Sequence, residues 1–212
     1  KTALQDQWEI SDVELDFFQF CKLQKNLRQG SWAVTLAIFN DHTSTPPRII
    51  EIWPGLYEGG LYGLAIDLGS TTIAAHLTDL KSGEVLKSAG LMNPQIRFGE
   101  DLMSRVSYSM MNSNGDKEMT AVVREAIDNL AEQLRKDVEI EKNSLVEVVF
   151  VCNPVMHHLL LGIDPVELGQ APFALASSNS ITVNASHLGL SNMNPSGAVS
   201  YTHLRAHETI AD

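Results

Sequence analysis

Three things are scarce in this chain: cysteine, positive charge and long apolar runs. The two cysteines, Cys21 and Cys152, are far apart in no metal-ligand spacing, so we expect buried thiols in a reducing cytoplasm and no cysteine-ligated metal or cluster site within the chain. The 15 Lys and Arg residues against 26 Asp and Glu give a net charge of −11, which argues against a nucleic-acid or anionic-membrane surface. No apolar run approaches the roughly 20 residues of a membrane span.

What is present is the composition of a globular protein. With 212 residues, 44% of them hydrophobic and 19% charged, the chain is long enough for one or two domains with a buried core. It begins at Lys1 with neither Met nor a signal-peptide pattern, so we expect its true N-terminus to be missing.

Residues 1–61 predict a small α+β module. Apolar residues at helical spacing indicate a helix over residues 4–29. Two strands are predicted after it, over 31–39 and 48–53, separated by a loop of turn-forming residues. Residues 57–61 are then expected to be the linker that leaves the module.

The pattern of residues 62–198 predicts a larger α/β lobe. The pattern starts with a three-stranded antiparallel meander, continues with two amphipathic helices, and ends with a buried strand followed by a helix that begins with proline. The predicted strands are 64–68, 72–79, 85–91 and 146–151, and the predicted helices are 100–111, 116–138 and 154–162. Residues beyond this look irregular except for one short strand at 181–183.

The turn between the first two strands of the meander predicts a chemistry. Phosphate oxygens need backbone N–H donors in a concave turn, and Gly69 allows close backbone approach. Ser70, Thr71 and Thr72 add hydroxyl donors, and Asp67 at the strand end could hold Mg²⁺ directly or through water. An ordinary hairpin is the alternative, and the turn is not a Walker A loop because no Gly-Lys-Ser/Thr follows.

Other stretches join the turn in pointing to a family. They are Asn93–Asp101 with Ser104-Arg105, then Cys152–Pro165, then Ala171–Phe173. The turn resembles the first phosphate motif of the superfamily of acetate and sugar kinases, heat-shock chaperones and actin. With the other stretches, residues 4–198 resemble the ATP-dependent reductive activators of corrinoid proteins. The resemblance implies a ribonuclease-H-like half of an actin-type ATPase domain, preceded by a linker and middle module.

The resemblance also implies an activity, cofactors and a partner. Such proteins use ATP and Mg²⁺ to return a Co(II) corrinoid protein to Co(I), which supports methyl transfer, and their [2Fe–2S] cluster would lie upstream of Lys1. Asp67 would then be the catalytic residue that positions metal and water, and Gly69 to Thr72 would hold the phosphates. Two positions depart from the family pattern: Ser70 replaces Thr, and Cys152 replaces a Gly.

Several polar residues keep two interpretations at this stage. Asn153 either faces the nucleotide cleft or simply caps the following helix. The segment 93–95 either lines the cleft or only opens a helix. His157 and His158 are adjacent and so face different sides of a helix, which favours packed histidines over a ligand pair. Asp101 and Arg105 have the i,i+4 spacing of a helical ion pair.

The C-terminal residues resemble translated adapter DNA. Residues 199–209 match one reading frame of a transposon-type sequencing adapter, so we expect 199–212 not to be native protein and exclude the i,i+4 pair His203 and His207 as a metal site. The chain would then be a fragment that lacks the second phosphate motif and the adenosine segment. Alone we expect it to be inactive, with exposed apolar surface that could drive homo-oligomer formation.

Two other functions stay open on the residues alone. The same fold serves small-molecule kinases, in which a bound metabolite would be phosphorylated. It also serves non-catalytic nucleotide-binding modules that act through partners. A cysteine-rich segment upstream in the parent gene would favour the activator, and its absence would favour the kinase.

Overall fold

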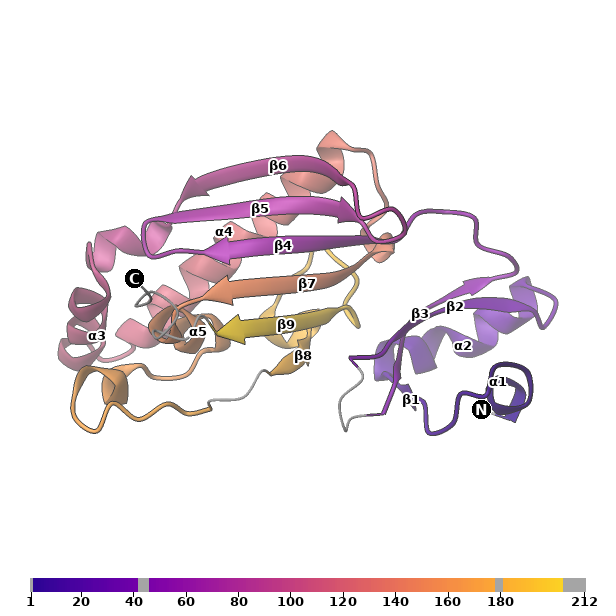
Figure 1. The fold of residues 1–212 in the computed structure, drawn as a ribbon, viewed down its shortest axis with the longest axis horizontal. Coiled ribbons are helices and arrows are strands. Elements are labelled where there is room, and N and C mark those ends of the chain that lie inside the picture. The colour runs from indigo at the N-terminus through magenta and orange to yellow at the C-terminus, as the bar shows by residue number, and fades with distance from the viewer. Residues whose placement is uncertain (1, 42–45, 178–180, 204–212) are drawn as a thin grey trace, which may run out of the picture.

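The computed structural model describes residues 2–41, 46–177 and 181–203, which form a small N-terminal module and a larger α/β lobe (Figure 1). In the module, α1 (Thr2–Trp8) is followed by β1 (Glu14–Leu15), α2 (Phe17–Gln29), β2 (Val34–Phe39) and β3 (Arg48–Pro54). The three strands form a sheet in the order β1-β3-β2, and α2 packs on β3.

The larger sheet has the strand order β6-β5-β4-β7-β9-β8. Strands β4 to β6 form the predicted antiparallel meander, while β7 and β9 run parallel to β4 and β8 is antiparallel to β9. The strands are β4 (Tyr62–Leu68), β5 (Thr72–Asp79), β6 (Val85–Met92), β7 (Leu145–Cys152), β8 (Thr182–Asn184) and β9 (Ala198–His203). The helices are η1 (Pro94–Phe98), α3 (Leu102–Met111), α4 (Gly115–Asp137), η2 (Lys142–Ser144), α5 (Pro154–Leu161), η3 (Val166–Gly169) and η4 (Ala185–Leu188).

The main core lies between one face of this sheet and helices α4 and α5. Alternate residues of β4, such as Ile66 and Leu68, point to this face, and the apolar stripe of α4, including Ile127 and Leu134, packs against it. The side chains on the opposite face of β4, including Ala65 and Asp67, are exposed. Within the described ranges, no helix combines the length and apolar character that crossing a membrane requires.

The predicted helix over residues 4–29 is wrong because it is interrupted. Glu9 and Asp12 both have φ of 55°, in the left-handed region, which no continuous right-handed helix can contain. The chain therefore forms α1 and β1, and α2 starts anew after Asp16, whose side chain accepts from the Phe18 N–H. Cys21 lies on α2 and is exposed, so the prediction of a buried thiol at this position is wrong.

The region after α5 contains more regular structure than its sequence predicts. The short strand is present as β8, and a second strand, β9, extends the sheet beside β7. Val199 and Tyr201 of β9 are buried in the core. The adapter origin of residues 199–212 stays a prediction, and residues 204–212, with His207, lie outside the described residues.

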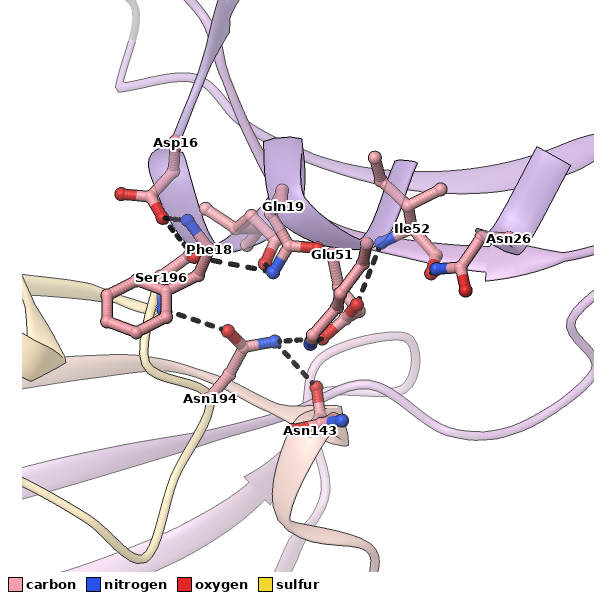
Figure 2. Close-up of polar contacts among 11 residues, drawn as sticks. Asp16, Phe18, Gln19, Asn26, Glu51, Ile52, Asn143, Asn194 and Ser196 are labelled. Carbon is pink, nitrogen blue, oxygen red and sulfur yellow. Dashed lines mark hydrogen bonds and ion pairs between the residues drawn. The ribbon is translucent and has the colours of Figure 1, made fainter. Parts of the chain in front are cut away.

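A buried polar residue of the larger lobe joins it to the N-terminal module (Figure 2). The side chain of Asn194 is fully buried, and its Nδ2 donates to Oε2 of Glu51 at 2.8 Å and to the carbonyl of Asn143 at 3.0 Å. Its Oδ1 accepts from the N–H of Ser196 at 3.0 Å. One amide side chain thus links β3 of the module to η2 and to the segment before β9 of the lobe.

Further bonds surround this link. Oε2 of Glu51 also pairs with Lys22 at 3.3 Å, which places a cation beside the buried carboxylate. The carboxylate of Asp16 accepts from the hydroxyl of Ser196 at 2.8 Å and from Nδ2 of Asn184 at 2.6 Å. The bond from Asn194 to Glu51 and the two bonds to Asp16 cross between the module and the lobe, so the two units contact each other through a polar network.

Candidate phosphate-binding site

The site is built on the turn that joins β4 to β5. The N–H of Gly69 donates to the carbonyl of Thr72 at 3.0 Å, which closes the hairpin. A Cβ on residue 69 would lie only 2.7 Å from that carbonyl oxygen, so the turn requires glycine for close backbone approach. Thr71 and Thr72 are exposed and Ser70 is half-buried.

Three successive carbonyls of this turn are held from inside the protein. Nδ2 of Asn93 donates to the Gly69 carbonyl at 2.8 Å, and the backbone N–H of Asn93 donates to the Thr71 carbonyl at 2.8 Å. Between them, Nη2 of Arg105 donates to the carbonyl of Ser70. Asn93 and Arg105 are both fully buried, so the three carbonyls are directed toward the interior.

This arrangement fixes the direction of the amide groups. The peptide bonds of the turn are trans, and in a trans peptide the C=O and the following N–H point in opposite directions. Because the carbonyls of Gly69 and Ser70 face buried donors, the N–H groups of Ser70 and Thr71 point away from them. Two consecutive N–H groups that point to the same side are the kind of donors that bind phosphate oxygens.

A buried glutamine supports the residues that hold the turn. Gln95 donates its backbone N–H to Oδ1 of Asn93 at 2.9 Å and its Nε2 to the Met119 carbonyl at 3.0 Å, and it accepts from Nη1 of Arg105 at 3.3 Å. Asn93 and Gln95 are therefore behind the turn and do not line an open cleft. Asp101 caps α3 by accepting from the Ser104 N–H at 2.7 Å, while Arg105 turns inward.

Asp67 lies near the end of β4, opposite Ala74 of β5 and Val151 of β7, and its side chain is exposed. Among the described residues, no group of three or more His, Cys, Asp or Glu side chains is placed to hold a metal ion. A single exposed carboxylate fits Mg²⁺, which keeps several of its waters and usually takes one or two protein carboxylates together with substrate phosphates.

Asn153 lies at the same edge of the sheet as the turn, because Leu68 at the end of β4 pairs with Cys152 at the end of β7. Its Oδ1 accepts from the Met156 N–H at 3.0 Å, so Asn153 caps α5. Contact of Asn153 with a nucleotide stays a prediction. Cys152 is buried, as predicted. Burial, with a smaller contribution from the charge of Asp67, raises the pKa of the Cys152 thiol to about 12.

The two histidines of α5 are both buried, as predicted for packed residues. Nε2 of His158 accepts from the Ala176 N–H at 3.2 Å, so Nδ1 carries the proton and donates to the Pro154 carbonyl at 2.8 Å. The chain's two cysteines, one exposed and one buried, cannot supply the four ligands of a [2Fe–2S] cluster.

Both parts of the chain match regions of one known protein family. The RACo linker region matches residues 1–59, and the RACo middle region matches residues 62–206. The chain belongs to the RACo family.

Two relatives show the extent of the similarity. The corrinoid activation enzyme RamQ of Eubacterium limosum is 30% identical over 158 residues, which are 74% of this chain and 26% of RamQ. A solved structure of a reductive activator for corrinoid, iron-sulfur protein superimposes with a TM-score of 0.84 at 30% identity, covering 95% of this chain and 31% of that one. The α/β fold class, with a small module preceding an actin-type half domain, is thereby confirmed. The chain spans about a third or less of these relatives.

Proposed function

We propose that this chain is part of an ATP-dependent reductive activator of corrinoid proteins, and that it contributes the first phosphate-binding turn. The observation that carries the proposal is the β4–β5 turn of a RACo-family chain, whose carbonyls face buried donors and whose N–H groups at Ser70 and Thr71 point away. The names of RamQ and of the solved activator support a corrinoid protein as the partner.

In the proposed reaction, ATP is hydrolysed to ADP and phosphate while the corrinoid cobalt gains one electron, from Co(II) to Co(I). The amides of Ser70 and Thr71 and the hydroxyls of Thr71 and Thr72 hold the phosphates, and Asp67 orients the water shell of Mg²⁺. Bound Mg²⁺ would neutralise charge on the phosphate oxygens. ATP can favour one conformation only through its different affinity for the two states, so these contacts must differ between them.

A ferredoxin-type [2Fe–2S] cluster takes four cysteine ligands and this chain has two, so the proposed electron donor is another part of the parent protein. We propose that a [2Fe–2S] domain precedes Lys1 in the parent protein. We also propose a cytoplasmic location, where free thiols such as Cys21 and Cys152 stay reduced. A homo-oligomer stays a prediction.

The test is the cobalt spectrum of a corrinoid protein mixed with reductant and the longer protein that contains this chain. With MgATP we expect the Co(II) spectrum to convert to Co(I), and without it much more slowly. Asp67→Asn should slow the conversion at least tenfold, whereas Glu84→Gln, an exposed carboxylate beyond the other end of β5, should not. A Co(II) spectrum that stays unchanged with several corrinoid proteins would overturn the proposal, and a phosphorylated metabolite would favour the kinase.

A further inference from the structure

Arg105 is a buried cation whose described hydrogen bonds go only to uncharged acceptors. It is fully buried in α3, and its guanidinium donates to the carbonyls of Ser70 and Gly99, to Oε1 of Gln95 and to the sulfur of Met156. None of the salt bridges found among the described residues includes it. Removing a charge from water without an ion-pair partner costs desolvation free energy. A purely structural role for Arg105 would leave that cost uncompensated.

The position of the charge suggests what compensates that cost. The guanidinium contacts the carbonyl of Ser70, and the next N–H in the chain, that of Thr71, points to the opposite side. An anion bound by the Thr71 N–H would therefore be separated from the guanidinium by one peptide group. The peptide dipole and the guanidinium charge would then both attract it.

We propose that Arg105 is a positioning residue of the phosphate turn, which fixes the Ser70–Thr71 peptide with its N–H outward and supplies the positive charge behind it. This inference rests on the proposed function, since it assumes that the turn binds phosphate. The bond to Ser70 sets the orientation of the peptide, and the bonds to Gly99 and Gln95 hold the guanidinium in place. Lysine keeps the charge but lacks the rigid fork that reaches several acceptors at once.

The experiment uses the 212-residue chain and Mg-tripolyphosphate, a probe that carries the phosphates without adenosine. Titration is followed by amide ¹H–¹⁵N resonances, which detect weak binding and identify the turn. In the wild type we expect shifts at residues 69–72. Arg105→Met should weaken the affinity about tenfold or more and displace the Thr71 resonance already in the free protein. Arg105→Lys should recover part of the affinity.

Arg124→Met is the matched control. Arg124 is partly buried where Arg105 is fully buried, and its Nε donates to the Leu160 carbonyl at 2.8 Å, so it links α4 to α5. None of its described hydrogen bonds goes to the turn. We expect the affinity of Arg124→Met for Mg-tripolyphosphate to stay within twofold of wild type, even if the substitution lowers the free energy of unfolding. If Arg105→Met does not fold, Arg105→Lys decides: a folded variant with wild-type affinity and an unmoved Thr71 resonance overturns the role of Arg105.

The outcomes separate this inference from the function on which it rests. No shift at the turn of the wild-type chain at millimolar tripolyphosphate would overturn both. Binding at the turn that Arg105→Met leaves within twofold of wild type would overturn the role of Arg105 alone. Equal losses in Arg105→Met and Arg124→Met would also overturn it, because they would reduce the effect to general stability.

Discussion

Replacing Asn194 with aspartate tests the contact between the N-terminal module and the lobe. The substitution Asn194→Asp preserves size but exchanges the Nδ2 donor for a carboxylate oxygen that faces Glu51. It removes one bond to a charged acceptor, worth about 1.5–3 kcal/mol, and one to the Asn143 carbonyl, worth about 1 kcal/mol. Because Asn194 is fully buried and Lys22 compensates only one carboxylate, we expect the free energy of unfolding to fall by about 3 kcal/mol or more.

The chain offers a matched control and two separate probes. Asn192→Asp makes the same exchange two residues earlier, where Nδ2 donates to Asp128 at 3.0 Å in a partly exposed setting, and should cost about 1 kcal/mol or less. All three tryptophans, Trp8, Trp32 and Trp53, lie in the module, so their fluorescence reports its unfolding, whereas far-ultraviolet circular dichroism reports both parts.

Urea unfolding followed by both probes should give coincident transitions in the wild type. In Asn194→Asp the fluorescence transition should come at lower urea than the dichroism transition, because the module loses its support from the lobe. Losses within about 0.5 kcal/mol of each other for Asn194→Asp and Asn192→Asp, with coincident transitions in both, would refute this account of the interface.

Three further predictions concern single side chains. At pH 8 a thiol reagent should label exposed Cys21 rapidly and buried Cys152 only as fast as the protein opens, and rapid labelling of two thiols would contradict the structure. Burial raises the pKa of Cys152 from 9.0 to about 12, so the stability that its neutral thiol contributes is complete below about pH 9 and falls as pH rises, by about 1.4 kcal/mol between pH 8 and 10. Cys152→Ala should remove that slope in urea unfolding at several pH values. The hydroxyl of Tyr201 is buried without a hydrogen-bond partner among the described residues, so Tyr201→Phe should leave the urea midpoint unchanged or raise stability by up to about 1 kcal/mol. A loss above 1 kcal/mol would show that the hydroxyl has a partner.

The meander and its turn were predictable because their signals are local. Alternation of apolar residues defines β4 and β5. Gly69 between them indicates the turn, because a side chain at this position would collide with the Thr72 carbonyl. The break after α1 was not predictable, because the apolar spacing continues through residues such as Glu9 and Asp12 whose left-handed conformation leaves no periodic signal.

The support behind the turn was also beyond local patterns. Arg105 stands four residues after Asp101, a spacing typical of an exposed ion pair, and nothing local shows that its side chain turns inward to reach Ser70, 35 residues earlier. In the sequence, Arg105 was marked only by its place in the stretch from Asn93 to Arg105 that resembles the family. Val199 and Tyr201 do alternate with polar residues, but the resemblance to adapter DNA excluded them from the predicted fold.

Strand β4 has a mechanical consequence. It leaves the N-terminal module at Tyr62 and reaches the phosphate turn after Leu68, and six residue steps of about 3.3 Å make this a rod of about 20 Å. It is clamped along its length by β5 and β7, so it cannot bend or shorten by itself (Figure 1). The turn after Leu68 and the linker before Tyr62 thus lie at opposite ends of one stiff strand, so a displacement at the turn reaches the module through movement of the whole lobe.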